Sequence, residues 1–201
     1  MKTAEVKRRR RTSGEARAEI LAIAERRLAE SGPEGVRLAA IADEMGVTHP
    51  AILRHFGTRE DLLRDLLRHA GRRMRDALAR SLPEGGGAPD LDAFAESLER
   101  TYRDEGFARL FVWLTFSGFQ PQGSGMFRPA ADEIHRARRG RKPDLEDTLF
   151  TLMLLNMALF ADALGGTAFR RAVDLPADRD TARRFREWLV ALVENRLAER
   201  G

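Results

Sequence analysis

The stretch from Thr48 to Arg59 carries the side chains best suited to bind a phosphate or a base edge. It reads THPAILRHFGTR, so two hydroxyls, two imidazoles and two guanidiniums fall within twelve residues. A threonine and free N–H groups at the start of a helix favour a phosphate. The planar fork of an arginine fits guanine O6 and N7. The stretch predicts a nucleic-acid contact in which His49 and Arg54 read base edges, or else an αα-hairpin with a solvated face.

Two short helices must position these side chains. Apolar residues spaced three and four apart predict one helix over 38–45 and a second that begins after Thr48, with Gly46 as the turn. Pro50 falls in the first turn of the second helix, where its missing N–H has no cost. The predicted inner face consists of Ile41, Ala42, Met45, Val47, Ile52 and Phe56.

The same spacing recurs along the whole chain and predicts an all-α protein. A first helix is expected after Ser13 as N-cap, ended by SGPEG at 31–35, and a fourth from Thr58 to about 82. Further helices are expected near 90–104, 107–119, 126–139, 144–164 and 178–199. The predicted domains are a disordered basic arm (1–12), a helix-turn-helix domain (13–57), a connecting helix (58–82), a linker (83–89) and a second helical domain (90–201).

The positive charge is concentrated at the start of the chain. Residues 1–82 hold 18 Lys and Arg against 12 Asp and Glu, whereas the remainder holds 17 against 19. This asymmetry favours a module that faces nucleic acid, although a basic surface also suits an acidic membrane or simple solubility. The run KRRRR at 7–11 is either a disordered tail or an arm that enters a minor groove, and non-specific attraction to DNA is the intermediate expectation.

Several classes of function find no support in the sequence. The 201 residues include no cysteine, so disulfides and thiolate metal sites are excluded. No metal-binding H-E-x-x-H, P-loop, G-x-G-x-x-G or G-x-S-x-G occurs, so no catalytic residue, metal or cofactor is expected. The most apolar segment, 148–166, is interrupted by Asn156, Asp162 and a glycine pair. We therefore expect no membrane span and a cytoplasmic location.

The segment from Ile41 to Leu63, IADEMGVTHPAILRHFGTREDLL, resembles the DNA-binding region of the TetR family of bacterial repressors. The resemblance covers the first third of the chain. Together with the residues on the open side of the second helix, it leads us to expect DNA contacts from Arg37, Thr48, His49, Pro50, Ala51, Arg54, His55 and Arg59, of which Arg59 matches the family's phosphate clamp. His55 either contacts a phosphate or packs against Phe56.

Two positions depart from the family pattern. Arg37 replaces the usual Thr or Ser that caps the second helix, and it could reach a phosphate itself. Leu53 replaces a tyrosine, which removes a hydroxyl from the interface and leaves a side chain that packs or touches a thymine methyl.

The resemblance implies a homodimer that binds a palindromic double-stranded DNA operator and is released by a small-molecule effector. Dimerisation is expected from helix 144–164, which has two apolar stripes, and from the last helix, through Leu149, Leu152, Phe185, Trp188, Leu189 and Leu192. The alternative is that these helices only complete a monomeric core.

The effector site is expected among aromatic and polar residues of the second domain. The candidates are Tyr102, Trp113, Phe116 and Asn156. Aromatics at helical spacing could instead be simple core, and Asn156 could set the dimer register. For the whole chain, an effector-independent activator or nucleoid-type DNA binder and a dimeric all-α enzyme or carrier are the other candidates.

Overall fold

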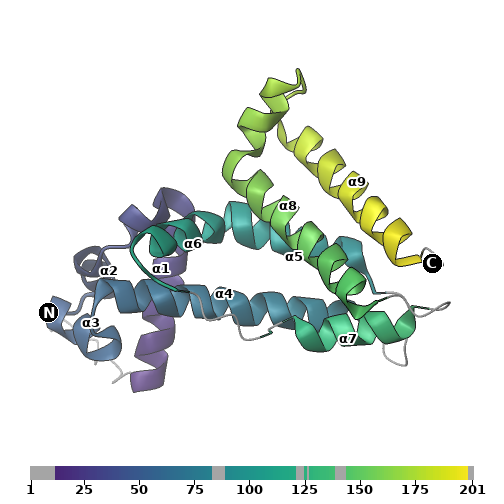
Figure 1. The fold of residues 1–201 in the computed structure, drawn as a ribbon. Coiled ribbons are helices and arrows are strands. Elements are labelled where there is room, and N and C mark those ends of the chain that lie inside the picture. The colour runs from purple at the N-terminus through teal and green to yellow at the C-terminus, as the bar shows by residue number, and fades with distance from the viewer. Residues whose placement is uncertain (1–11, 83–88, 121–124, 126, 139–143, 199–201) are drawn as a thin grey trace, which may run out of the picture. The chain divides into compact units, whose positions relative to one another are not determined.

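Helices are the regular elements of this protein, as the sequence predicts. The computed structural model describes residues 12–82, 89–120, 125, 127–138 and 144–198, and within these ranges every regular element is a helix (Figure 1). The chain divides into two compact units, Met1–Leu66 and Leu67–Gly201. The boundary falls inside the fourth helix, and the linker predicted at 83–89 lies almost entirely outside the described residues.

The first helix, α1 (Ser13–Gly35), begins one residue earlier than predicted. Thr12, not Ser13, is the N-cap: its Oγ1 accepts from the Glu15 N–H at 3.2 Å, and the Thr12 N–H donates to the Glu15 carboxylate at 2.8 Å. This capping box satisfies two N–H groups that the helix leaves unpaired. The hydrogen bonds from Thr12 also lower the pKa of Glu15 below its usual value.

The helical path of α1 is interrupted where SGPEG predicts its end. Gly32 has a φ of 69°, a left-handed value that favours glycine, and Pro33 follows it. The Val36 N–H then donates to the Pro33 carbonyl at 3.2 Å. This turn leads the chain directly into α2 (Leu38–Met45), whose bounds agree with the prediction.

The first unit is built around one apolar core. α3 (His49–Phe56) follows α2, and the beginning of α4 (Arg59–Ser81) closes the unit. The predicted inner face is confirmed except that Val47 is half-buried. Each of the larger apolar side chains stabilises the fold by about 1.5–3 kcal/mol when it is fully buried. The buried set is Ile20, Ile23, Ala24, Leu28, Val36, Leu38, Ile41, Ala42, Met45, Ile52, Phe56, Leu62, Leu63 and Leu66.

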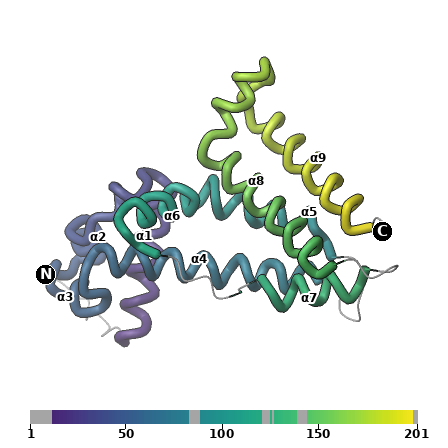
Figure 2. The backbone as a smooth tube through the Cα atoms, viewed as in Figure 1, coloured from purple at the N-terminus to yellow at the C-terminus, as the bar shows by residue number. Residues whose placement is uncertain are grey.

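The second unit contains the rest of α4 and five further α-helices with one π-helical segment. They are α5 (Leu91–Glu99), the π-helix η1 (Arg100–Asp104), α6 (Phe107–Phe116), α7 (Arg128–Ala137), α8 (Leu145–Ala172) and α9 (Arg179–Ala198). Figure 2 shows α8 and α9 as an antiparallel pair, and α5 and η1 pack against α8. The core between them includes Phe94, Leu98, Leu155, Leu159, Leu189 and Val190.

The helix α8 is longer than predicted. The pair Gly165–Gly166 was expected to end it near 164, but the helix continues to Ala172. By length and composition, α8 could also cross a membrane, and 22% of its most apolar 18-residue window is buried. A core helix of a soluble protein meets the same criteria, so this property says little by itself.

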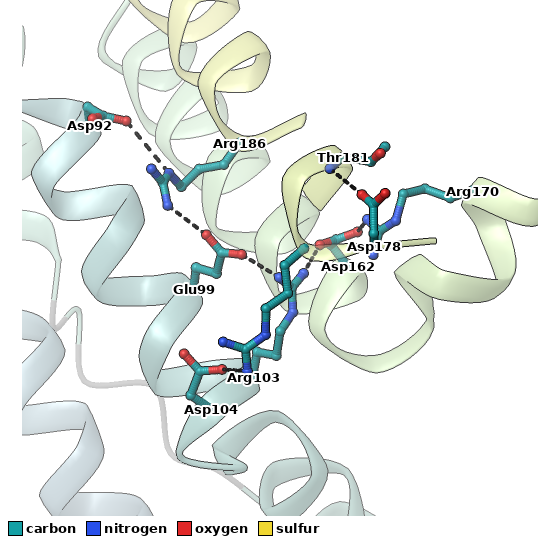
Figure 3. A network of polar contacts seen from close by, with 10 residues as sticks. Asp92, Glu99, Arg103, Asp104, Asp162, Arg170, Asp178, Thr181 and Arg186 are labelled. Carbon is teal, nitrogen blue, oxygen red and sulfur yellow. Dashed lines mark hydrogen bonds and ion pairs between the residues drawn. The ribbon is translucent and has the colours of Figure 1, made fainter. Parts of the chain in front are cut away.

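Six charged side chains form an alternating network across α5, η1, α8 and α9 (Figure 3). Asp162 of α8 is bound by Arg103 and Arg170, and Arg103 also binds Glu99. Glu99 accepts from Arg186 of α9 at 2.8 Å, and Asp92 lies 3.6 Å from the same guanidinium. We call Asp92, Glu99, Arg103, Asp162, Arg170 and Arg186 the charged network. The Asp162 and Arg170 side chains are 9% and 10% exposed, so their mutual pairing is needed to offset lost hydration.

Gly166 allows the charged network to cross the surface of α8. An added Cβ at this position would lie 1.9 Å from the Asp162 Oδ1 atom and 3.0 Å from the Arg170 Nη1 atom. Asp162 and Arg170 are two helical turns apart, so their side chains meet directly over the buried backbone of Gly166. The glycine is therefore part of the ion pair rather than a helix terminator.

We predict that Gly166→Ala lowers the free energy of unfolding by about 2–4 kcal/mol. Breaking a buried ion pair costs about 3–5 kcal/mol, and the better helix propensity of alanine offsets about 1 kcal/mol. Gly165→Ala is the matched control, because its Cβ would approach only the exposed Phe169 ring, at 3.3 Å. Urea unfolding of both variants tests this, and equal stability of the two would contradict the role given to Gly166.

Candidate nucleic-acid interface

The turn between α2 and α3 is formed by Gly46, as predicted. Gly46 adopts φ 61° and ψ 41°, a left-handed conformation that a side chain would disfavour. Its N–H donates to the Asp43 carbonyl at 3.1 Å, and the Val47 N–H donates to the Ala42 carbonyl at 2.9 Å. These bonds satisfy the end of α2 and allow α3 to begin only three residues later.

The helix α3 has one buried face and one open face. Ile52 and Phe56 are buried against the core of the first unit, while Thr48, His49, Pro50 and Arg54 are exposed. Ala51, Leu53 and His55 are half-buried. The open side of α3 thus carries mainly polar side chains.

Thr48 occupies the N-cap position of α3 but does not use its hydroxyl for capping. Its backbone is extended, with φ −81° and ψ 150°, and its side chain makes no capping hydrogen bond. The first N–H groups of an α-helix have no partner within the helix. The start of α3 therefore offers the Thr48 hydroxyl to an anion, whereas Pro50 has no N–H and the Ala51 N–H already donates to the Thr48 carbonyl at 2.9 Å.

Arg54 projects from α3 without an internal role. It is exposed, and no hydrogen bond or ion pair joins its side chain to another described residue. An exposed arginine of this kind retains all five N–H donors for a ligand. Its placement is compatible with the predicted base readout, as is that of the exposed His49.

Arg59, the predicted phosphate clamp, has internal hydrogen-bond partners. Its Nε atom donates to the Val36 carbonyl at 2.7 Å, and Nη2 donates to the Pro33 carbonyl. The side chain is 23% exposed and lies 3.7 Å from the Glu34 carboxylate. Both carbonyls belong to the turn between α1 and α2, so the guanidinium stabilises that turn and has few donors left for DNA.

The surroundings of Arg37 and His55 neither support nor contradict the phosphate contacts predicted for them. Arg37 is the exposed N-cap of α2 and makes no capping bond with its side chain, although Nε reaches the Glu34 carbonyl at 3.4 Å. The half-buried His55 contributes its backbone carbonyl to an internal hydrogen bond. The phosphate contacts expected from these two residues stay predictions.

Arg17 is a residue that the sequence analysis did not single out. Its Nη1 atom donates to the His55 carbonyl at 2.5 Å, and its guanidinium carbon lies 4.2 Å from the centre of the Phe56 ring. Nη2 binds the Asp65 carboxylate at the beginning of α4. These partners are 38 to 48 residues away in sequence, and no local motif on α1 marks the position.

Two of the predicted effector residues meet in the second unit. The Tyr102 hydroxyl donates to Asn156 Oδ1 at 2.8 Å, and the Phe160 ring packs edge-on against Tyr102 at 5.4 Å. Burial raises the pKa of Tyr102 to about 12, with the Asn156 hydrogen bond opposing the shift, so the phenol remains a neutral donor. Trp113 is half-buried. Phe116 is 89% exposed, so it lines no enclosed site within the single chain, and its predicted effector contact stays a prediction.

The predicted dimer contacts separate into two groups. Trp188 and Leu192 are 60% and 42% exposed, and Phe185 stacks beside Trp188. Leu149 is half-buried. Leu189 is 2% exposed and packs inside its own unit, and the half-buried Leu152 packs against the same core. The dimer contact predicted for Leu152 stays a prediction. The open apolar face of α8 is the other stripe, formed by Phe150, Met153, Leu154, Met157 and Leu164.

Two further predictions concern the basic run at 7–11 and metal binding. The basic run at 7–11 lies outside the described residues. Within the described ranges, no group of three or more His, Cys, Asp or Glu side chains could hold a metal ion.

Comparison with solved structures shows the fold. TetR from Acinetobacter baumannii AYE is 21% identical, with a TM-score of 0.58 over 88% of this chain and 95% of that chain. A TetR variant from the same organism, in complex with minocycline, is 24% identical, with a TM-score of 0.54 over 90% and 96%. The superantigen PfiT is 18% identical, with a TM-score of 0.52 over 93% and 96%. A superantigen among these structures illustrates that function must be argued from the site.

Comparison of sequences identifies the DNA-binding unit more specifically. No curated protein matches the chain in sequence. The family model described as "Bacterial regulatory proteins, tetR family" matches residues 20–66, which cover the helix-turn-helix and the surrounding core. Residues 20–66 are thereby identified as an N-terminal domain of the TetR family of bacterial regulatory proteins.

Proposed function

We propose that this protein is a dimeric, ligand-responsive repressor that acts in the cytoplasm by binding a palindromic DNA operator, without catalysis. The observation that carries the proposal is the open polar face of α3 next to the glycine turn at Gly46. In a helix-turn-helix, such a second helix enters the major groove with its N-terminal residues toward the bases. Thr48 would bind a phosphate there, and His49 and Arg54 would read base edges.

Dimerisation is supported by the apolar surface left open on α8 and α9. Five apolar side chains of α8 are 43–60% exposed along one face, and Trp188 and Leu192 of α9 are exposed as well. An exposed apolar surface of this kind marks an interaction site. We propose that a second copy covers it with the same surface, in a four-helix arrangement.

The effector site is proposed around the Tyr102–Asn156 pair. The pair supplies polar groups beside the Phe160 and Phe111 rings, which meet edge-on at 5.5 Å. Apolar walls with a few hydrogen-bonding groups are typical of small-molecule sites. The minocycline bound to the TetR variant supports a small-molecule ligand for this chain too. Such a ligand would weaken operator binding only by favouring the conformation that binds DNA less well.

The proposal is tested by selecting fragments of the source genome that the purified full chain retains, followed by footprinting of the best fragment at physiological salt. We expect a protected site with two-fold symmetry and an affinity at least about 1,000-fold above that for bulk DNA. Binding that is equally strong on all fragments and is abolished by modest salt would overturn the repressor assignment.

Arg54 is expected to determine one base position in each half-site. Arg54→Ala should weaken binding to the selected fragment by about 1–3 kcal/mol and relax the preference at one position. Arg171→Ala, which removes an exposed arginine from the second unit, is the control for loss of charge. Repeating the selection with a randomised site measures both effects, and an unchanged preference in Arg54→Ala would exclude it from base readout.

The open face of α8 is expected to be the dimer interface. Met157 is 60% exposed in the centre of this face, and a carboxylate there would appear twice in a symmetric interface without a partner. Sedimentation of the unmodified chain should give twice the single-chain mass of 22.6 kDa, and Met157→Asp should sediment as a monomer. Thr167→Asp on an exposed part of the same helix should remain dimeric. A dimeric Met157→Asp would exclude this face.

A further inference from the structure

The C-terminal end of α3 is held by a single arginine of α1. Arg17 contacts the His55 carbonyl, the Phe56 ring and the Asp65 carboxylate, and all three partners lie within the first unit. His55 is the immediate neighbour of Arg54, the residue proposed to read a base. The contact therefore fixes the backbone directly beside the proposed readout.

This end of α3 needs an external donor. The helix has eight residues and ends at Gly57, whose φ of 78° turns the chain away. The Gly57 N–H returns to the Leu53 carbonyl at 2.7 Å, and the Thr58 N–H reaches the Phe56 carbonyl at 3.0 Å. Arg17 supplies the donor for the His55 carbonyl, and its positive charge opposes the negative end of the helix dipole.

The three contacts together require an arginine. One terminal nitrogen of Arg17 binds the α3 carbonyl, the other binds the α4 carboxylate, and the guanidinium lies over the Phe56 ring. A lysine has one compact charged group and cannot make both fixed hydrogen bonds while it stacks on a ring. The guanidinium thus fixes the direction of α3 relative to both α1 and α4.

We infer that Arg17 is a positioning residue for sequence-specific DNA binding: it holds the C-terminal end of α3 at the angle that base readout requires. This inference rests on the proposed function. At 1.5 Å per residue α3 is about 12 Å long, so a tilt of about 10° moves one end by about 2 Å relative to the other. A displacement of that size removes a base contact, because hydrogen bonds span only about 2.7–3.2 Å.

Two simpler roles would give different results. Arg17 could serve stability alone, in which case its loss lowers the melting temperature but leaves DNA selectivity unchanged. Its side chain is 43% exposed, so it could also contact a phosphate directly. Loss of one phosphate contact would weaken binding to all DNA and reduce the salt dependence by about one counterion per subunit.

The experiment compares Arg17→Gln and Arg17→Lys with a matched control, Arg27→Gln. Arg27 also lies on α1 and also contacts a backbone carbonyl and a carboxylate, but its partners, Ala40 and Glu44, belong to α2. Affinities for the selected fragment and for a scrambled fragment are measured at several salt concentrations, well below each melting temperature. The ratio of the two affinities is the selectivity.

We expect Arg17→Gln to reduce the selectivity about 10- to 100-fold while the affinity for scrambled DNA and its salt dependence stay unchanged. Arg17→Lys, which keeps the charge and should fold even if Arg17→Gln does not, should also lose selectivity, to a smaller extent. Arg27→Gln should keep the selectivity of the unmodified chain.

Unchanged selectivity in both Arg17 variants, or an equal loss in Arg27→Gln, would overturn the inference. An equal loss of affinity for both fragments with a reduced salt dependence would also overturn it and assign Arg17 to a phosphate. The unmodified chain reports separately on the proposed function: if it shows no selectivity at all, the repressor assignment fails, whatever the variants do.

Discussion

The structure of the first unit depends on the contacts that stabilise α3, because this helix is too short to be stable alone. A helix of eight residues is too short to be stable in water, so α3 owes both its existence and its direction to its neighbours. Ile52 and Phe56 attach its inner face to the core, and the Gly46 turn fixes where it begins. At the C-terminal end of α3, the Arg17 guanidinium donates to the His55 carbonyl. A polar outer face can stay free for DNA because none of its side chains is needed for this attachment.

The second unit is organised around α8, a helix that is apolar nearly all round. One side packs on α5 and α9 through Leu155 and Leu159, and the opposite side remains open in the single chain. Close to the end of this helix, the charged network joins α5, η1, α8 and α9 through directional contacts. Apolar packing tolerates sliding between helices, whereas paired charges fix one register. The network therefore complements the core by specifying how the four elements align.

The sequence predicts the local structure well because local signals determine it. The bounds of α2 follow from its apolar spacing and the glycine at its end, and the buried face of the helix-turn-helix follows from the same pattern. Predictions were less complete where side-chain pairing decides the structure. The pair at Gly165–Gly166 looks like a helix end, because the sequence does not show that Asp162 and Arg170, four residues to either side, form an ion pair across Gly166. The sequence also does not show that Arg59 donates to the carbonyls of Val36 and Pro33, 23 and 26 residues away. The two stripes of α8 cannot be told apart by periodicity alone.

The arrangement over Gly166 also limits how this helix can change during evolution. Any side chain at 166 enters the space of the Asp162 carboxylate, and loss of either charged partner leaves the other buried without compensation. With the charged pair gone, the same position would accept alanine and gain helix propensity. Residues 162, 166 and 170 are therefore expected to be substituted together. Among related sequences, glycine at 166 should accompany the acid and the arginine, and larger residues should appear there only where both have been replaced.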